Sequence, residues 1–453
     1  MNMTRRDLMR AAMLAASASG FGWMKALAAP ASDYKALVCV FLNGGNDGNN
    51  LIVPLNTDEY TAYATVRGGL ALPKTSDTPN AALLSMGAPK SQPGREFGLH
   101  PALSALLPMW QQGKLAVQCN VGSLVAPLTM AEYKANRNRP YSLFSHSDQQ
   151  AQWQTAESEE VGRTGWGGRL ADAALGLNGG VTIPSLISLS GSTLFGVGRR
   201  TSPLVSPASG NFGLSGTGTS ASAKARTEGI AALLGMDRNN ILAAAANNAL
   251  GTALNSAAII SPIINNGAAG VATHFTGLTG NFNAQLLAVA KLIEARAALG
   301  LSRQIFFVQL GGFDTHSNQI SAQEGLFAQL GNSLAAFYKA MEGLGLANQV
   351  TAFTSSDFSR TLRPASGAGS DHAWGNHHMV LGGAVKGGDF YGAFPTLALK
   401  GPDDIDGAGR WLPTTSIDQY AATFARWFGV ADSELTTVLP YLSRFNQTHM
   451  GFL

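Results

Sequence analysis

Short apolar runs alternate with longer amphipathic segments along this chain. Residues 37–42, 115–121 and 303–310 are apolar runs of strand length, bounded by glycine or polar residues. Residues 283–299 and 321–346 instead place apolar side chains three and four positions apart, which is typical of one buried helix face. Because strands separated by helices usually form parallel sheets, the pattern predicts an α/β fold with a mostly parallel central sheet.

The other predicted elements are shorter or richer in small residues. Helices are predicted over residues 100–112, 145–153, 165–175, 227–234, 239–260 and 417–428, and a strand over residues 181–188. Residues around 191–223 are rich in Gly, Ser and Thr, and we interpret them as a surface excursion or lid. The domain prediction is therefore a single α/β domain over residues 30–453 that contains this excursion.

Composition agrees with a large globular protein. With 45% apolar and 13% charged residues, a chain of 453 residues can bury an extensive core. The net charge is only +3, so no polybasic surface indicates nucleic acid or anionic lipid as a partner. Cys39 and Cys119 lie in apolar runs, which predicts buried free thiols; a disulfide would require their strands to be adjacent.

The N-terminal residues have the pattern of an export signal. Arg5 and Arg6 form a twin-arginine pair, an Ala-rich run extends to Gly22, and residues 26–28 form a small-residue cleavage site. We therefore expect residues 1–29 to be a signal peptide that directs the chain to the periplasm or beyond through the twin-arginine pathway. No other stretch has about 20 continuous apolar residues, so no integral membrane segment is expected in the mature chain.

Acidic and histidine side chains follow several of the predicted strands. Asp314 and His316 come directly after residues 303–310 and two glycines, and in extended backbone residues two apart point the same way. Asp47 follows the first strand in a Gly-rich turn, and Asp357 stands at another strand end. Since the carboxyl ends of parallel strands share one sheet edge, these side chains predict a divalent metal site there.

A histidine-rich loop adds further candidate ligands. His372 follows a flexible Gly/Ser loop, and Asp371 could accept a hydrogen bond from an imidazole of the site. His377 and His378 open an apolar run where neighbouring side chains point to opposite faces, so at most one of them faces the site. Carboxylate and imidazole ligands suit zinc, manganese, iron or calcium, and the residue types alone do not choose among them.

Two further residues have alternative interpretations. Ser145 precedes a predicted helix, where it is either an N-cap or a hydroxyl displayed at the helix start. His146 lies beside this candidate nucleophile and has either a role in the site or a plain polar role. Asp357 could also cap a helix or pair with Arg360. No phosphate-binding GxxxxGK[ST] loop or dinucleotide fingerprint occurs.

The order of motifs carries a resemblance to a known family. After the twin-arginine leader come FLNGGNDGNNLIVP, GLHPAL, LFSHSDQ, GGFDTHSNQ, SSDFSRT and GSDHAWGNHHMVLGGAVKGG. Together they resemble the DUF1501 family of exported bacterial proteins of unknown function, over essentially the whole mature chain. That family is similar, more distantly, to the alkaline phosphatase/sulfatase superfamily, whose members have a mixed, mostly parallel sheet between helices and a metal site at the strand ends. The resemblance thus implies an alkaline phosphatase-like three-layer sandwich.

The resemblance also implies roles for particular residues. Asp47 matches the metal-binding acid after the first strand, and Ser145 is the candidate nucleophile. The other implied metal ligands are Asp314, His316, Asp357 and His372, with His377 or His378 as a rival to His372. Two departures weaken the match: Phe358 stands where phosphatases often place a histidine, and the sulfatase Cys-x-Pro-x-Arg signature is absent.

Two functional hypotheses follow. The first is a metal-dependent hydrolase of small phosphate or sulfate esters that uses zinc, manganese or calcium, with Ser145 or a metal-bound water attacking. Arg360, or less well Arg169, would hold the anionic group. The second is a non-catalytic envelope binding or assembly protein with a degenerate metal site. Members of the resembling family commonly occur beside DUF1800-type proteins, which implies such a protein as a partner.

Overall fold

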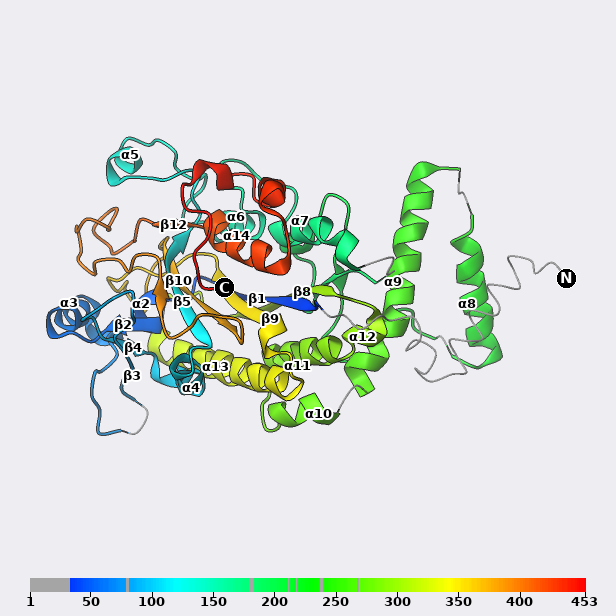
Figure 1. Ribbon diagram of the computed structural model, residues 1–453, viewed down its shortest axis with the longest axis horizontal. Coiled ribbons are helices and arrows are strands. Elements are labelled where there is room, and N and C mark those ends of the chain that lie inside the picture. Colours follow the sequence, from blue (N-terminus) through cyan, green and yellow to red (C-terminus); the bar gives the residue numbers. More distant parts are fainter. Residues whose placement is uncertain are drawn as a thin grey trace.

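A large mixed sheet forms the centre of the molecule (Figure 1). The computed structural model describes residues 33–78, 81–178, 183–210, 212–216, 218–236, 239–266 and 269–453. Within these residues the strand order is β11 (Phe390–Tyr391), β5 (Leu115–Gly122), β10 (Asn376–Gly382), β9 (Val350–Ser356), β1 (Lys35–Asn43), β8 (Arg303–Gly311), β6 (Leu186–Ser188) and β7 (Leu204–Val205). A further short strand, β12 (Thr415–Ser416), pairs with β5.

The central strands run in parallel. β1 pairs in parallel with both β8 and β9, and β6 continues the parallel arrangement beyond β8. β10 is antiparallel to β9 and to β5, which makes the sheet mixed. The prediction of an α/β fold with a mostly parallel sheet is therefore confirmed.

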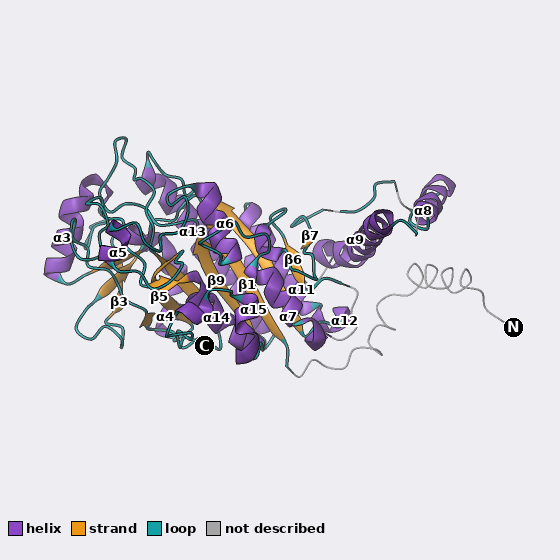
Figure 2. Ribbon diagram, turned by 90° about the horizontal axis from the view of Figure 1, so that it is seen from above, coloured by secondary structure: helices purple, strands orange, loops and turns teal. Residues whose placement is uncertain are grey.

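Helices cover both faces of the sheet, because strand side chains alternate between two cores. In β1, the side chains of Val38 and Val40 belong to one core, and those of Cys39 and Phe41 to the other. The first core also contains side chains of α11 (Asn281–Glu294) and α13 (Gln319–Gly343). The second contains side chains of α6 (His146–Thr155), α7 (Trp166–Ala173) and α14 (Ile417–Phe428). Figure 2 shows helices on both sides of the strands.

The predicted helices are found with small changes at their ends. The predicted helix 321–346 is α13, and residues 417–428 form α14 as expected. Residues 283–299 divide at Ala295 into α11 and α12 (Arg296–Leu299). Residues 100–112 form a 3-10 segment, η3 (Pro101–Leu106), and then α4 (Leu107–Gln111), because Leu103 departs from helical backbone angles.

Smaller elements surround this framework. A second sheet has the order β2 (Ile52–Pro54), β4 (Phe97–Leu99) and β3 (Leu84–Gly87). Other α-helices are α2 (Gly48–Leu51), α3 (Thr57–Arg67), α5 (Met130–Lys134), α10 (Ala269–Ala272) and α15 (Leu435–Val438). Further 3-10 segments are η2 (Gly68–Leu70), η4 (Leu175–Asn178), η5 (Leu194–Gly196), η6 (Thr273–Phe275), η7 (Ala347–Gln349), η8 (Asp432–Glu434) and η9 (Leu442–Arg444).

One helix and the first part of the next stand away from the body of the molecule, whereas Ile260, Ile263 and Ile264 near the end of the second pack into the first core. α8 (Ala221–Leu233) and α9 (Ile241–Asn266) lie at one end in Figure 1, on the chain that follows the Gly/Ser-rich excursion. The end of α8, the start of α9 and the segment between them carry large exposed apolar side chains. These are Leu233, Met236, Ile241 and Leu242. The predicted helices 227–234 and 239–260 correspond to parts of these two elements.

Both cysteines are buried free thiols, as expected. Cys39 is on β1 and Cys119 on β5, and β9 and β10 lie between these strands. Strands about 4.8 Å apart place the two thiols roughly 14 Å from each other, too far for a disulfide. In the described part of the chain we find no helix with both the length and the hydrophobicity to cross a membrane. The predicted signal peptide, residues 1–29, lies outside the described residues.

Candidate metal centre

Four polar side chains converge beyond the carboxyl ends of the central strands. Asp314 and His316 lie in the loop after β8, His372 lies in the loop before β10, and His146 is the first residue of α6. The Nε2 atom of His372 is 3.1 Å from that of His146 and 3.0 Å from that of His316. The Oδ1 atom of Asp314 lies 3.3, 3.0 and 3.5 Å from the Nε2 atoms of His146, His316 and His372, respectively.

The opposite ring nitrogens of the three histidines have partners outside the cluster. His146 Nδ1 donates to Oδ2 of Asp357 at 2.7 Å, and His372 Nδ1 donates to the carbonyl oxygen of Phe144 at 2.7 Å. His316 Nδ1 is 3.4 Å from Oδ1 of Asp371. Carboxylate and carbonyl acceptors fix the tautomer of histidines that bind a metal through the other nitrogen.

This hydrogen bonding directs two nitrogen lone pairs into the cluster. A carbonyl oxygen only accepts, so neutral His372 holds its hydrogen on Nδ1 and directs the Nε2 lone pair into the cluster. Neutral His146 does the same because its Nδ1 faces a carboxylate. Two lone pairs then face each other at 3.1 Å with the Asp314 carboxylate beside them. A proton on His146 relieves part of this repulsion, whereas one cation at the centre relieves all of it.

The spacing of the cluster fits a single ion. Metal–nitrogen bonds of about 2.0–2.1 Å place neighbouring ligand atoms roughly 2.9–3.4 Å apart, for angles between 90° and tetrahedral. Five of the six separations among these four atoms are 3.0 to 3.5 Å. Among the described residues, only His146, Asp314 and His372 have ligand atoms that all lie within 4.8 Å of one another. His146, Asp314 and His372 could therefore hold one divalent cation, and His316 could join them as a fourth ligand after its side chain shifts.

One side of the cluster is open to solvent. The side chains of Asp314 and His316 are 49% and 47% exposed, whereas those of His146 and His372 are 27% and 24% exposed. The open side could admit water or a substrate to an ion held there. A closed structural site would instead enclose its ligands.

Charges and burial shift the pKa values of the cluster. Burial acts to raise the pKa of Asp314, but the hydrogen bond and charge of Arg360, with His146 and His316 nearby, lower it to about 2. The hydrogen bond to Asp357 raises the pKa of His146. Burial lowers the pKa of His372, which favours its neutral, ligand-competent form.

Asp357 lies behind the cluster rather than in it. Its side chain is buried, and its Oδ1 accepts from the amide of Gly44 at 3.0 Å. Its Oδ2 accepts from His146 Nδ1 and, at 2.7 Å, from Nε2 of Gln150. We expected Asp357 to bind the metal directly, but its oxygens are engaged by protein donors, and the residue orients His146 instead.

Phe358 forms an apolar wall under two of the imidazoles. Its ring centroid lies 4.7 Å from that of His146 and 4.7 Å from that of His372. Phe358 thus restricts the orientation of both rings and shields one side of the cluster from water.

Arg360 is positioned differently from our expectation. Its guanidinium is fully buried and donates to the carbonyl oxygens of Gly44, Gly45 and Ser370 and to Oδ1 of Asp314. The side chain therefore holds the loop and Asp314 and does not face a substrate. The second candidate, Arg169, is also buried, with acceptors that include the Val438 and Thr155 carbonyl oxygens.

Asp47 does not join the cluster. It is the N-cap of α2, is fully buried, and forms an ion pair with Nη2 of Arg67. Its Oδ2 also accepts from Nε2 of Gln319 at 2.6 Å. The guanidinium of Arg67 supplies the positive charge that we expected a metal ion to supply to this carboxylate.

His377 and His378 also lie away from the cluster, within the sheet. The ring of His377 stacks on Phe394 at 4.7 Å, and that of His378 meets Trp153 edge to face at 4.6 Å. Burial lowers the pKa of each to about 3. Adjacent strand residues point to opposite faces, as predicted, but both faces here are core, so His377 packs rather than binds a metal.

Ser145 stands next to the cluster as the N-cap residue of α6. Its hydroxyl donates to Oδ2 of Asp148 at 2.5 Å and does not cap the helix with its side chain. The structure thus places the candidate nucleophile one residue before His146, with an acidic acceptor for its proton.

The structure brings together three of the six expected metal ligands, Asp314, His316 and His372, and adds His146. The sequence gives one signal for His146, since it opens a predicted helix beside Ser145. The sequence does not show that His146 lies near Asp314, because the fold of the loop before His146 brings the two residues together.

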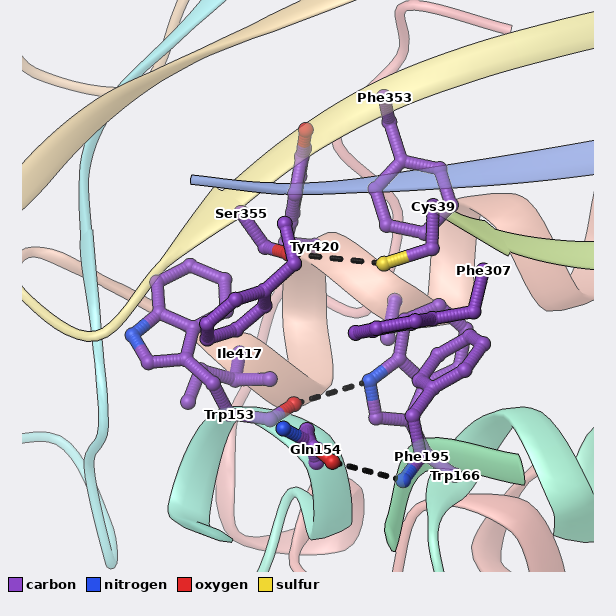
Figure 3. Close-up of a pocket in the computed structure, with 12 residues that line it drawn as sticks. Cys39, Trp153, Gln154, Trp166, Phe195, Phe307, Phe353, Ser355, Ile417 and Tyr420 are labelled. Atoms are coloured by element: carbon purple, nitrogen blue, oxygen red, sulfur yellow. Dashed lines mark hydrogen bonds between the residues drawn. The ribbon is translucent and has the colours of Figure 1, made fainter. Parts of the chain in front are cut away.

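An enclosed cavity lies elsewhere in the core and is not part of this centre. Figure 3 shows it between Cys39, Trp153, Trp166 and Tyr420, with a hydrogen bond from Trp166 Nε1 to the carbonyl oxygen of Trp153. Its volume is about 10 Å³, roughly the room for one water molecule. We interpret it as a packing gap between aromatic side chains.

Comparison with known proteins gives a family but no activity. No curated protein matches the chain. One family, described as "Protein of unknown function (DUF1501)", matches residues 34–435, which include every residue of the histidine cluster. The chain therefore belongs to the DUF1501 family.

Proposed function

We propose that this protein is an exported, metal-dependent hydrolase of phosphate or sulfate esters. The observation that supports it best is the convergence of the Nε2 atoms of His146 and His372 and Oδ1 of Asp314 at the separations of ligands around one ion, with His316 Nε2 beside them. The open side beside Asp314 and His316 distinguishes it from a closed structural site. We also propose that the chain is related to the alkaline phosphatases, although that relationship would imply more metal ligands than the cluster contains.

The donor set favours particular metals. Three imidazoles and one carboxylate form a nitrogen-rich set, which suits zinc or manganese better than calcium, since calcium takes six to eight oxygen ligands. Asp47 and Asp357 lie outside the cluster, and their oxygens accept from protein donors there, so we propose one ion rather than two.

The chain's own residues would prepare the site for hydrolysis. A bound divalent ion supplies Lewis acidity for a water molecule and for an ester oxygen. Asp357 and the Phe144 carbonyl accept the Nδ1 hydrogens of His146 and His372, so the Nε2 lone pairs of the neutral rings face the cluster, and Arg360 keeps Asp314 ionised. Ser145 is the candidate protein nucleophile, and Asp148 is positioned to accept its proton.

Elemental analysis tests the proposal. The mature protein, purified without chelator, should contain about one divalent ion per chain. His146→Ala and Asp314→Ala should lose that ion, whereas His274→Ala, which changes an exposed histidine outside the cluster, should retain it. A screen of phosphate and sulfate monoesters with the loaded protein then tests hydrolysis. Wild-type protein without metal would contradict the proposal, as would loaded protein that hydrolyses no ester in either class.

A second candidate function has a separate observation in its favour. The exposed apolar side chains Leu233, Met236, Ile241 and Leu242 of the α8–α9 region suit a binding or assembly role, with a DUF1800-type protein as the proposed partner. Co-purification of the pair, lost on Ile241→Ser/Leu242→Ser substitution, would support it. A protein that contains metal, hydrolyses no ester and pairs in this way would favour the second function over the first.

A further inference from the structure

A polar cleft borders the metal centre and shares a wall with it. Its lining includes Tyr133, Asn136, Asn138, Arg139 and Phe144. Phe144 is the shared residue, because its carbonyl oxygen accepts the hydrogen bond from His372 Nδ1. The cleft has a volume of about 530 Å³, enough for a small organic ester.

The guanidinium of Arg139 lines this cleft and has donors that could bind a ligand. Its Nε donates to the carbonyl oxygen of Tyr133 at 2.7 Å, and the guanidinium carbon lies 3.9 Å from the Tyr133 ring centroid. In the described part of the chain, its two terminal nitrogens have no hydrogen-bond or ion-pair acceptor. A guanidinium fixed through Nε and an aromatic face has lost little freedom to bind a tetrahedral or planar oxyanion with its remaining donors.

The balance of charge in the cleft also favours an anion. Glu159 also lines it, but this carboxylate pairs with Nη2 of Arg444 at 2.8 Å. Asn136, Asn138 and Ser142 contribute amide and hydroxyl groups without adding negative charge. The positive charge of Arg139 is therefore not cancelled by an acid of the cleft.

The backbone of the cleft wall is held in an unusual conformation. Asn136, Asn138, Ser142 and Phe144 have φ values of 57°, 51°, 44° and 71°. Asparagine adopts this left-handed region readily, but an aromatic residue does so at a cost. At Phe144 the conformation directs the carbonyl oxygen to His372, and the Arg410 guanidinium packs over the ring at 5.0 Å. The same loop thus shapes the cleft and orients a residue of the metal centre.

We infer that Arg139 and the cleft formed by residues 133–144 bind the anionic group of the substrate beside the metal centre. The substrate class is an ester with a phosphate or sulfate group, and this inference rests on the proposed function. It assigns to Arg139 the role that the sequence suggested for Arg360, whose donors are occupied.

Calorimetric binding of inorganic phosphate and of inorganic sulfate to the metal-loaded full-length mature protein tests this inference. Arg139→Gln should weaken binding of at least one anion by about tenfold to hundredfold, the range for loss of a charge-assisted hydrogen bond. Arg137→Gln, which removes a nearby exposed arginine outside the cleft lining, should leave binding unchanged. Comparing phosphate with sulfate identifies the preferred ester class.

Metal content of each variant separates this inference from the proposed function. Both arginine variants should retain the wild-type content of divalent ion. If Arg139→Gln binds both anions as tightly as wild type, the anion binds elsewhere and the inference is overturned while the metal proposal stands. Failure of the loaded wild-type protein to bind either anion also overturns it. Absence of metal from the wild-type protein contradicts the proposed function directly.

Discussion

Asp314 and Asp47 follow neighbouring parallel strands, β8 and β1, in Gly-rich loops, yet they have opposite surroundings. Asp314 is half exposed, and its Oδ1 faces the Nε2 atoms of three imidazoles as well as the Arg360 guanidinium that donates to it. Asp47 is fully buried, and Arg67 and Gln319 bind it through their own donors. A carboxylate at a strand end therefore does not by itself predict a metal site. What matters is whether its neighbours include imidazole nitrogens that face the same point, as they do at Asp314, or only hydrogen-bond donors, as at Asp47.

The largest expected effect is on the Asp314 side of this comparison. His372→Ala should lower metal affinity by at least about a thousandfold, because it removes the ligand whose Nε2 contacts the other three ligand atoms. Its thermal unfolding without metal should differ little from that of the wild-type protein without metal. Elemental analysis and calorimetric metal titration measure the first effect, and thermal melts with chelator measure the second. Retention of metal by this variant would show that the ion lies elsewhere.

Substitution of the partner of Asp47 should instead lower the stability of the protein and leave its metal content unchanged. Arg67→Met leaves a buried, unpaired carboxylate and should reduce the free energy of unfolding by about 3–5 kcal/mol, as measured by denaturant titration. The double variant Asp47→Asn/Arg67→Met should recover part of this loss because no charge remains unpaired. Folded protein of either variant should keep its metal content. Loss of metal from a folded, stable Asp47→Asn variant would instead show that Asp47 is a ligand.

Substitution of Asp357 tests how strongly a residue that orients a ligand affects metal affinity. In Asp357→Asn, an amide nitrogen placed at Oδ2 opposes the Nδ1 hydrogen of His146 and favours the tautomer whose Nε2 cannot bind a metal. We expect metal affinity to fall by about tenfold to hundredfold. Asp371→Asn is the matched control, because this carboxylate is 54% exposed and lies 3.4 Å from His316, and it should change affinity by less than about threefold. Equal effects of the two substitutions would contradict the tautomer argument.

The sequence predicted the sheet and half of the expected ligands for the same reason. Strand periodicity is local, and it places Asp314 and His316 at the end of β8 and His372 near the start of β10. Partner choice is not local: Arg67 reaches Asp47 from α3, and Gly44 and Gln150 engage Asp357 from other elements. His146 was not expected among the ligands because the loop before it has left-handed residues, Ser142 and Phe144, that no turn signal in the sequence predicts.

The two core histidines contrast with the histidines of the cluster, because their effect is confined to the pH dependence of stability. Burial lowers the pKa of His378 to about 3 in the folded protein, from 6.5 in the unfolded chain. As pH falls below about 6.5, the unfolded chain binds a proton that the folded protein does not, so the residue's contribution to stability is progressively lost. His378→Phe preserves the contacts of an aromatic ring with Trp153 and Tyr420 and removes this titration. Between pH 6 and pH 4, its free energy of unfolding should therefore fall less steeply than that of wild type, by up to about 1.4 kcal/mol per pH unit. Denaturant titrations at several pH values measure the slope, with His274→Phe as the exposed control. An unchanged slope would mean that His378 is already protonated in the folded protein and that its surroundings in the sheet are less dry than the packing indicates.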